Sequence, residues 1–563
     1  MTTSLPPALI MLLAGLALPL LANRVWRAAM SLGAPVVALA LIWTTPDGPV
    51  LTAQILTFDL TILQGTTTGR LFGTIFAIMA FVGALFALKQ TNALEASSAL
   101  IYAGSAIGVS GAGDLITMFV FWEVMAVGST LVLWSAGERT YLAARRYLLV
   151  HLFGGVVLMA GITGHVAETG SIAFTAIELA GVSSWLILIG FLINAGAPPF
   201  SAWLPDAYPE ASWSGTVFLS AFTTKTAVFV LLITFAGNEI LVWVGLYMVF
   251  YGIIYALLEN DMRRILAYSI VNQVGFMVCG IGIGTELALN GAASHAFAHI
   301  IYKALLLMAA GAVLYQTGRR KCTDLGGLFH SMPITTICGI IGALAISSFP
   351  LTSGFVSKSM ISDAAGHEHL AVVWFLLYAA SAGVFLHAGI KFPWFVFFQK
   401  DSGLRPSDPP ASMRWAMIIF AFLCIAIGVY PEPLYALLPY PVDYVPYTVG
   451  HVLHMTQLLL FAGLAFFVLL PLMKRTLTIS LDTDTLYRLV GPWLAKVVGR
   501  TVGAADRAMR QTAMRWFQDL VAALERVHGV SGVLARDLNM TVTVLAVVIA
   551  FGLILLFDLI QGL

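Results

Sequence analysis

Charged side chains are scarce in this chain of 563 residues: they make up 10% of it, while 59% of its residues are hydrophobic. A soluble globular protein carries about 25% charged residues, and the mean hydropathy here is +0.91. So few polar groups cannot cover a water-facing surface, which excludes a soluble enzyme. Apolar runs of about 18 or more residues recur, as expected for membrane-spanning helices. Because these runs are continuous rather than alternating, a transmembrane β-barrel is excluded as well.

The chain also lacks the patterns that bind metals, nucleotides or nucleic acid. Its four cysteines lie far apart and form no disulfide or metal-binding pattern: Cys279, Cys322, Cys338 and Cys424. There is no glycine-rich dinucleotide motif, Walker P-loop or HExxH helix, and the net charge of +1 does not indicate nucleic-acid binding. His295 and His299 are candidates for haem ligation, but two histidines on one helix face would have to serve different irons. The sequence therefore predicts no cofactor, no metal and no nucleic-acid partner.

We expect an all-α polytopic membrane protein with about sixteen transmembrane helices. The expected spans are residues 5–22, 28–45, 71–88, 93–111, 114–135, 143–165, 182–199, 214–236, 240–258, 265–285, 288–315, 333–352, 371–395, 414–430, 454–473 and 541–560. No basic residue precedes the first apolar run, so we interpret it as a retained span rather than a cleaved signal peptide.

Basic residues indicate how these spans are oriented. With the N-terminus outside, most of the 29 lysines and arginines fall in inner loops, whereas Arg70 and Lys358 fall outside. An even number of spans then places both termini on the outer side, and we expect the bacterial inner membrane. Three lysines fit neither side, because Lys225, Lys303 and Lys391 lie inside apolar spans.

Residues 482–537 are the one long segment that is too polar to span the membrane. They mix charges with apolar side chains at helical spacing, which indicates an amphipathic helix on the inner membrane surface. Trp493, Phe517, Leu520 and Leu524 suit such an interface or a partner protein. A soluble linker is the alternative interpretation.

Two ionisable residues in the first half of the chain lie within apolar runs. A charge at mid-membrane costs about 2.5–3.5 kcal/mol, so such residues persist where they face a cavity, form pairs or carry function. Glu123 lies in one span and Lys225, with Thr224 beside it, in another.

The second half has a similar set of buried polar residues. His295, His299 and Lys303 recur every four residues, so they share one helical face and extend over about 12 Å of membrane depth. His387 and Lys391 repeat this spacing before a proline, Pro393, that is expected to break the helix.

These groups suit proton transfer. Burial disfavours the charged form of lysine and a nearby carboxylate favours it, while histidine titrates near neutral pH and can relay between such sites. The alternative is that Glu123 and Lys225 form a static ion pair and that His295 is a satisfied core histidine. We favour a proton path because these groups recur in several separate spans.

Proline and glycine interrupt the apolar spans at two related places. One is AGAPPFSAWLPDAYPEAS, before the span with Lys225, and the other is SSFPLTSGFVSKS, before the span with Lys391. Internal repeats with broken helices near buried ion sites are typical of secondary transporters.

Four segments around these residues resemble the antiporter-like membrane subunits shared by respiratory complex I and the Mrp-type cation/proton antiporters. WLPDAYPEAS is similar to the family's WLPDA segment, ALLENDMRRILAYSIVNQVGF to its D-I-K-R-L-L-A-Y-S segment, HAFAHIIYKALLLMAAGAVLYQTG to its H-x-x-x-H-x-x-x-K-A-L-L-F helix, and FPLTSGFVSK to its F-P-P-L-x-G-F-x-S-K segment. They occur in the family's order, and the resemblance covers roughly residues 70–430.

The resemblance implies two inverted five-helix repeats with broken helices, each a half-channel, joined by a polar axis along the membrane midplane. Glu123 and Lys225 match the family's Glu–Lys pair, Lys303 with its two histidines matches the central site, and Lys391 matches the terminal lysine. The possible accessory residues are Thr224, Tyr251, Lys358, Arg146 and Asp206. The implied divisions are N-terminal helices (1–112), the two repeats (113–258 and 265–430), a further span (431–474), a surface segment (475–540) and a C-terminal span (541–563).

This chain departs from the family pattern in three places. Asn194 stands where the family usually has a lysine, and Pro199-Phe200-Ser201 replaces its P-x-H. The span at 240–258 has no lysine or histidine, only Tyr247, Tyr251 and Tyr255, so water or tyrosine is expected to bridge Lys225 and His295.

The resemblance leads to one main function and two alternatives. The main hypothesis is a proton-translocating subunit of a multisubunit Mrp-type Na⁺/H⁺ antiporter, a transporter rather than an enzyme, with the other subunits, H⁺, Na⁺ and the lipid bilayer as partners. The second is a proton-pumping subunit of a redox complex, such as complex I or a membrane-bound hydrogenase. The third is a structural scaffold whose charges are static.

Overall fold

The computed structural model describes residues 5–55, 57–471, 482–483, 485–528 and 540–561, which form two units, Met1–Asp484 and Thr485–Leu563. The first half of the first unit contains α1 (Pro7–Ala17), α2 (Arg24–Thr44), α3 (Thr67–Phe86), α4 (Ala93–Ser110), α5 (Leu115–Trp134), α6 (Tyr141–Thr169), α7 (Val182–Ala195), α8 (Trp203–Ala207), α9 (Gly215–Leu219) and α10 (Thr223–Thr234). The second half contains α11 (Ile240–Leu258), α12 (Met262–Ile283), α13 (Glu286–Thr317), α14 (Pro333–Ile346), α15 (Ser353–His367), α16 (Ala371–Val384), α17 (Ala411–Val429), α18 (Glu432–Tyr435) and α19 (Val449–Val468).

The predicted all-α membrane fold is confirmed. In the described residues, 12 helices are long and apolar enough to cross a membrane, and three shorter apolar helices accompany them: Pro7–Leu20, Val182–Ala195 and Pro333–Ile346. The expected count of sixteen is not confirmed by this measure, because several predicted spans are short or rich in serine and glycine, as α4 is. The chain is a multi-pass membrane protein.

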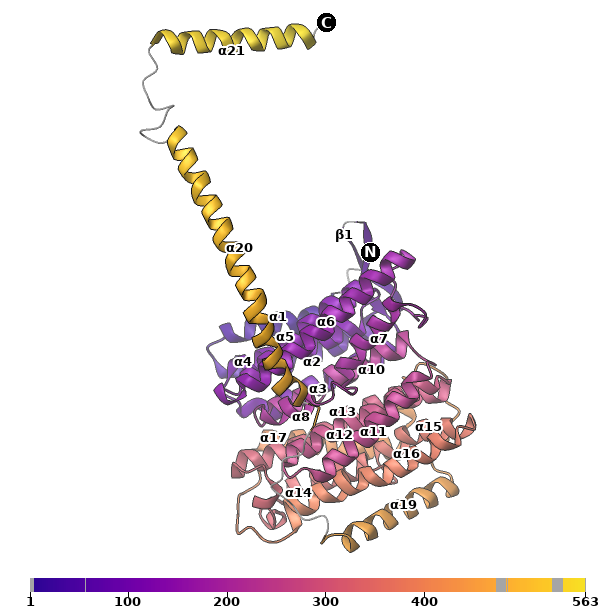
Figure 1. The fold of residues 1–563 in the computed structure, drawn as a ribbon. Helices are drawn as coiled ribbons and strands as arrows, with labels where there is room; N and C mark the ends of the chain where they lie inside the picture. Colours follow the sequence, from indigo (N-terminus) through magenta and orange to yellow (C-terminus); the bar gives the residue numbers. More distant parts are fainter. Residues whose placement is uncertain (1–4, 56, 472–481, 484, 529–539, 562–563) are drawn as a thin grey trace. The chain divides into compact units, whose positions relative to one another are not determined.

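The buried centre of the first unit is formed by α12 and α13. Figure 1 shows the earlier helices (indigo to purple) on one side of this pair and the later ones (magenta to orange) on the other. α13 packs against α3, α9 and α10 from the first half and against α14, α15 and α17 from the second. Groups on α13 therefore lie where the two halves meet.

Two spans are broken at the places where proline and glycine predict it. α9 and α10 form one span interrupted at residues 220–222, and α14 and α15 are separated by residues 347–352. In the second break, Ser348 and Leu351 adopt positive φ angles of 57° and 69°. Such breaks leave backbone carbonyl groups without helical partners inside the bundle.

Two sequence predictions about the second half are wrong. Lys358 is not on the outer surface: it belongs to α15, packed against α13, and is 2% exposed. Pro393 does not end its helix, because π-helical turns η7 (Phe385–Lys391) and η8 (Trp394–Phe398) extend it. The wider π turn accommodates a residue that lacks a backbone N–H donor.

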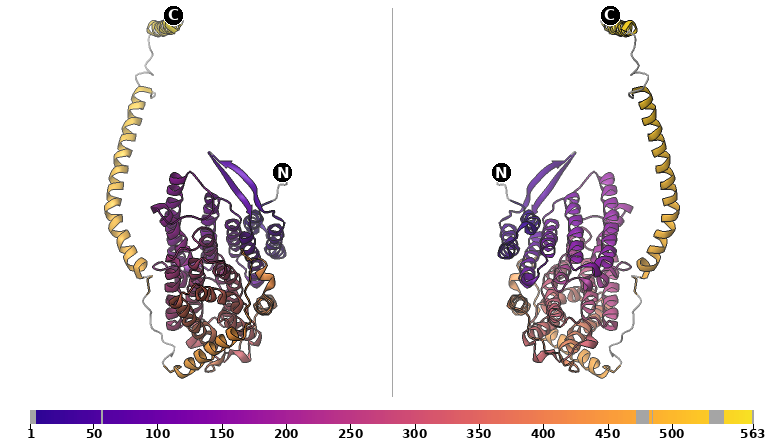
Figure 2. Two further views of the ribbon diagram at one scale, coloured as in Figure 1. Left: turned by 90° about the vertical axis from the view of Figure 1, so that its right-hand side faces the viewer. Right: turned by 90° about the vertical axis from the view of Figure 1, so that its left-hand side faces the viewer.

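A β-hairpin between α2 and α3 was not part of the all-α prediction. β1 (Gly48–Ile55) pairs antiparallel with β2 (Phe58–Gly65), and Figure 2 shows the hairpin projecting from one end of the bundle. Asp114, the N-cap of α5, anchors it by accepting a 2.7 Å hydrogen bond from the Thr61 backbone N–H.

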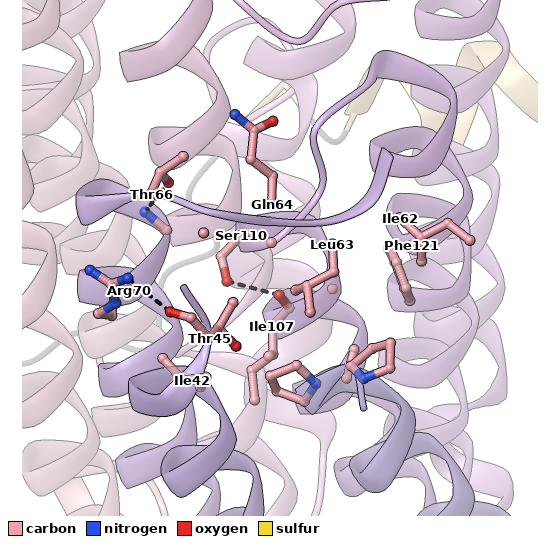
Figure 3. Close-up of a pocket in the computed structure, with 17 residues that line it drawn as sticks. Ile42, Thr45, Ile62, Leu63, Gln64, Thr66, Arg70, Ile107, Ser110 and Phe121 are labelled. Carbon is pink, nitrogen blue, oxygen red and sulfur yellow. Dashed lines mark hydrogen bonds between the residues drawn. The ribbon is translucent and has the colours of Figure 1, made fainter. Parts of the chain in front are cut away.

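A small pocket of about 40 Å³ lies where β2 meets the ends of α2, α3 and α4 (Figure 3). Arg70 at its edge is paired with Asp47 at 2.7 Å and donates a 3.1 Å hydrogen bond to the Thr45 carbonyl. With its cation paired and its remaining walls mostly apolar, the pocket is a packing feature of the hairpin.

The second unit contains η9 (Leu486–Val490), α20 (Gly491–His528) and α21 (Met540–Gln561). The predicted surface segment, 475–540, includes residues 475–481, 484 and 529–539, which lie outside the described residues. Trp493, Phe517, Leu520 and Leu524 on α20 are all exposed. The placement of α20 at a membrane surface stays a prediction.

The two halves of the first unit are joined at one end by a buried arginine. Arg263, at the start of α12, is 2% exposed. Its guanidinium donates hydrogen bonds of 2.7–2.9 Å to the carbonyl groups of Pro209, Ala211 and Ser212. It thereby fixes the non-helical stretch that leads into α9.

We expect Arg263→Ala to lower the free energy of unfolding by about 3 kcal/mol or more, because it leaves buried carbonyl groups without charge-assisted hydrogen bonds. The measurement is thermal unfolding of the detergent-solubilised protein. Arg264→Ala is the matched control: that side chain is 34% exposed and pairs with Glu259 at 3.4 Å, so its removal should cost less than about 1 kcal/mol. Equal effects of the two substitutions on thermal unfolding would contradict the stabilising role of the Arg263 hydrogen bonds.

Candidate functional site

The ammonium group of Lys225 lies at the break between α9 and α10. It is fully buried, and it donates hydrogen bonds to the Ser220 carbonyl at 2.6 Å and to the Thr224 hydroxyl at 3.1 Å. Ser220 is the first residue of the interruption, so its carbonyl has no helical partner to compete with the lysine. The break therefore provides the polar environment that this buried cation needs.

Glu123 lies on α5, and its carboxylate faces a glycine of α6. A Cβ atom at Gly155 would lie 2.1 Å from Glu123 Oε1, so only glycine leaves room for the carboxylate. Glu123 Oε1 is buried and has no hydrogen-bond partner. Among the ion pairs of the described residues none joins Glu123 to Lys225. The static Glu123–Lys225 ion pair, the alternative interpretation of these residues, is therefore not found among the described residues.

Further polar side chains are buried on the neighbouring helices of this half. Asn194 is 1% exposed, and both of its amide atoms lack partners. His151 on α6, which the sequence analysis missed, is also 1% exposed; its Nδ1 lies 2.9 Å from the Tyr147 carbonyl, and its Nε2 has no partner. Buried polar atoms are nearly always satisfied, so these unpaired atoms mark a polar region inside this half of the bundle.

A hydroxyl network lies beside Lys225. Tyr102 and Thr223 share a 2.6 Å hydrogen bond, and Tyr147 donates to Ser129 at 2.9 Å. Tyr147 also lies 3.5 Å from the Thr223 hydroxyl. Hydroxyl groups both donate and accept, so they can pass protons between neighbours.

Lys225 is connected to the second half through direct packing of α10 against α12 and α13. His299 on α13 is fully buried, its two ring nitrogens lack partners, and it lies within electrostatic reach of Lys225 and Lys303. A bridge of water or tyrosine between Lys225 and His295 stays a prediction; of the candidate tyrosines, Tyr247 is 60% exposed and Tyr251 is 8% exposed. The direct contact arises because α13 crosses to the first half, which the sequence alone did not indicate.

The predicted histidine and lysine face of α13 is fully buried. His295 lies 3.1 Å from Gln273 Oε1 and 3.2 Å from the Ser357 hydroxyl, and Tyr302 donates to the same Gln273 oxygen at 3.1 Å. Lys303 donates to the Ser269 hydroxyl at 2.8 Å and approaches the Leu266 carbonyl at 3.3 Å. His295 is thus hydrogen-bonded, whereas His299 is not.

The terminal lysine is held by the end of another helix. Lys391, on η7, donates hydrogen bonds to three carbonyl groups at the C-terminal end of α11: Ala256 at 3.1 Å, Leu257 at 2.6 Å and Glu259 at 2.6 Å. His387, one turn earlier, has Nδ1 2.8 Å from the Gly383 carbonyl, while its Nε2 is buried without a partner. π-helical turns often occur at functional sites.

The accessory residues differ in their surroundings. Lys358 has no hydrogen-bond partner for its ammonium group, which lies 5.0 Å from the ring centroid of Phe276. Arg146 and Asp206 form a two-pronged ion pair with distances of 2.7 and 2.8 Å. Lys358 is thus a buried cation like Lys225 and Lys303, while the Arg146–Asp206 ion pair fixes the WLPDA helix, α8, to α6.

A second carboxylate that the sequence analysis missed belongs to Asp482. It is 8% exposed and accepts hydrogen bonds from the hydroxyls of Tyr251, at 2.6 Å, and Tyr268, at 2.7 Å. Tyr255 stacks on Tyr268 with ring centroids 5.2 Å apart. No local pattern in the sequence indicates that Asp482 meets these tyrosines, since more than 200 positions separate them.

The arrangement is a series of buried titratable side chains on several helices. No cluster of three or more histidine, cysteine or acidic side chains able to hold a metal occurs in the described residues. The series begins at Glu123, passes Lys225, His299, His295 and Lys303, and ends with His387 and Lys391. Such a series can take up, pass on and release protons.

Residues 112–386 match the family described as "NADH:quinone oxidoreductase/Mrp antiporter, TM". This match agrees with the resemblance found in the sequence.

Several curated relatives are antiporter subunits. The chain is 31% identical to a probable K(+)/H(+) antiporter subunit of Rhizobium meliloti, over 59% of this chain and 36% of that protein. It is 28% identical to an Na(+)/H(+) antiporter subunit of Alkalihalophilus pseudofirmus, over 70% of this chain and 83% of that protein. The chain thus spans about a third of the first relative, and it spans 47% of another Na(+)/H(+) antiporter subunit of A. pseudofirmus, to which it is 27% identical.

Two solved structures share the fold. A chain of the Mrp complex from Dietzia sp. DQ12-45-1b has a TM-score of 0.67 at 20% identity, covering 81% of this chain and 98% of that one. A chain of the membrane-bound sulfane sulfur reductase, an archaeal respiratory membrane complex, has a TM-score of 0.71 at 24% identity, covering 98% and 99%.

Gly155→Ala provides a test of the Glu123 site. The new methyl group occupies the position of the carboxylate, so we expect Glu123 to rotate away and proton transfer in vesicles to fall about tenfold or more. The fold should persist, because the displaced atom is the end of a flexible side chain. The control is Gly154→Ala, whose Cβ would meet Ile193 Cγ2 at 3.1 Å and stay clear of Glu123. If both variants transport equally well, the position of Glu123 is unimportant.

Proposed function

We propose that this chain is a proton-translocating membrane subunit of a multisubunit Mrp-type Na⁺/H⁺ antiporter. In this role it is a transporter subunit, not an enzyme, and its partners are the other subunits, H⁺, Na⁺ and lipid. The continuous series of buried titratable groups from α5 to η7 carries the proposal. The match of residues 112–386 to the NADH:quinone oxidoreductase/Mrp antiporter family and the relatives named as antiporter subunits support it.

Each repeat acts as a half-channel in this proposal. In residues 113–258, Glu123 exchanges protons with Lys225 through the region of Asn194 and His151. In residues 265–430, His299 receives the proton, His295 and Lys303 pass it on, and His387 and Lys391 complete the path. Thr224 orients Lys225, and Lys358 sets the charge near His295.

The number of hydrogen-bond acceptors around each buried lysine distinguishes the roles that these lysines have in the proposed proton path. An ammonium group has three N–H donors. Lys391 meets three carbonyl oxygens, so all three of its N–H donors are occupied. Lys225 and Lys303 each meet two acceptors, which leaves one N–H of each for transfer to a neighbour.

The membrane placement extends this proposal. We place the protein in the bacterial inner membrane with both termini outside, because this orientation puts most basic residues in inner loops. α20, with its exposed apolar and basic side chains, then lies on the inner surface.

A proton-pumping subunit of a redox complex is the second candidate. The observation that favours it is the fold match over 98% of this chain and 99% of a chain from an archaeal respiratory complex. Purification in mild detergent separates the two candidates: small antiporter subunits support the first, and iron–sulfur or flavin subunits support the second.

We expect Lys225→Ala and Lys391→Ala each to abolish proton transport, with a loss of about a hundredfold or more, while the complex still assembles. Dye-detected pH changes in inverted vesicles measure transport, and native gels measure assembly. Lys321→Ala, at an exposed residue, is the control. Normal transport in the Lys225 variant would favour the static scaffold, and loss of assembly would assign these lysines a structural role.

Asp482 extends the proposed path beyond the predicted residues. The tyrosines that donate to it lie on α11 and α12, and the carbonyl groups that hold Lys391 follow Tyr255 on α11. We place Asp482 as a proton-exchanging carboxylate next to the terminal lysine's helix. The hydroxyl groups of its two tyrosine donors can both donate and accept, so they can carry the proton.

Asp482→Asn separates proton exchange from anchoring, because the amide oxygen still accepts from both tyrosines but the side chain no longer titrates. We expect transport to fall about tenfold with assembly unchanged. Tyr251→Phe and Tyr268→Phe, which each remove one donor but keep the carboxylate, should reduce transport less. Wild-type transport in the Asp482→Asn variant would leave Asp482 an anchor alone.

A further inference from the structure

A cavity of about 250 Å³ opens near one end of the N-terminal helices, away from the pathway residues. It lies between η1 (Leu18–Leu20), the start of α2, η2 (Ala87–Lys89) and the start of α4. The inner loops predicted from the basic residues are those that form its mouth, so the cavity faces the inner leaflet of the membrane.

Three basic side chains line this cavity, and no acidic side chain does: Arg24, Arg27 and Lys89. No ion pair of the described residues involves any of them. The nearest buried carboxylate, Glu95, is turned away and is bonded to Ser214 and to Gln90 Nε2, the latter at 3.0 Å. The cavity therefore holds positive charge that the described chain does not neutralise.

The walls also carry apolar side chains. Leu18, Ala84, Leu100 and Phe218 are among them, together with the polar Gln90 and Asn92. A free inorganic anion gains no binding energy from apolar side chains, whereas an amphiphile binds to basic and apolar side chains together. The combination matches a phosphate group attached to a glycerol and acyl chains.

The surroundings are those of a helix end in contact with lipid. Leu20 is 84% exposed, and Val25 and Trp26 are 72% and 65% exposed. Exposed tryptophan at a helix end is typical of the membrane–water interface, and basic pockets between transmembrane helices at the inner surface bind anionic lipid headgroups.

We propose that this cavity binds the headgroup of an anionic phospholipid from the inner leaflet. Arg24, Arg27 and Lys89 contact its phosphate oxygens, and the first segments of its acyl chains lie against Leu18 and Phe218. Arg27 is already oriented, since its Nε donates a 2.5 Å hydrogen bond to the Leu21 carbonyl and leaves its other N–H groups free for phosphate. This site is separate from the proposed proton path, and its assignment to the inner leaflet rests on the orientation given under the proposed function.

The test uses the purified complex containing the full chain, delipidated in mild detergent and then titrated with phosphatidylglycerol or phosphatidylcholine. Native mass spectrometry counts the bound lipid. We expect specific binding of phosphatidylglycerol, weakened about fivefold for each of Arg24→Gln, Arg27→Gln and Lys89→Gln. The single variants Arg139→Gln, Arg145→Gln and Arg319→Gln are the matched controls, because each removes one positive charge from an exposed position outside the cavity.

A second variant keeps every charge. Ala96→Phe fills the cavity, since Ala96 lines it, and it should also abolish specific phosphatidylglycerol binding. Unchanged binding in both the basic-residue and the filled variants would overturn the proposal. Competition by excess inorganic phosphate as strong as that by the lipid would assign the site to a free anion, which overturns it too. A photocrosslinker at Thr91 that captures another protein of the complex instead of lipid would show that a protein covers the cavity, with the same consequence.

Discussion

A charge cannot stay in the hydrocarbon region unless polar atoms surround it, and this constraint explains the least regular parts of the bundle. Lys225 is held by a carbonyl group at the break between α9 and α10. Lys391 is held by three carbonyl groups where α11 ends. Backbone oxygen atoms become available in a membrane only where a helix stops or bends. The break between α9 and α10 and the end of α11 therefore supply the carbonyl oxygens that solvate Lys225 and Lys391.

Carbonyl oxygens carry only partial charge, so they solvate an ammonium group without neutralising it. A direct carboxylate partner would fix each lysine in its charged form, because a buried ion pair is costly to separate. Glu123 instead lies against Gly155, away from Lys225. The charge of each lysine can then respond to protonation of its neighbours, which is what a relay requires and what a static scaffold would avoid.

The features that are recorded locally in the sequence could be predicted, and those that depend on distant contacts could not. Lys225, Lys303 and Lys391 were recognisable because each interrupts an apolar run, and the two breaks because proline and glycine mark them. Lys358 was misplaced because a short helix after a break resembles a loop. His151 was missed because it is a single histidine within the expected span 143–165 and has no histidine or lysine at helical spacing beside it. Asp482 has no local signal at all, since its partners are on α11 and α12.

The position of Asp482 bears on why such a long polar segment follows the bundle. Burying the hydroxyl group of a tyrosine costs free energy unless the hydroxyl forms a hydrogen bond. The Asp482 carboxylate accepts hydrogen bonds from the hydroxyls of both Tyr251 and Tyr268. Without Asp482, two phenol groups in the region of α11 and α12 would face lipid or each other. The residue that begins the C-terminal segment is therefore tied to the helix whose end holds Lys391. A displacement of Asp482 would therefore first change the polar surroundings of Tyr251 on α11 and Tyr268 on α12.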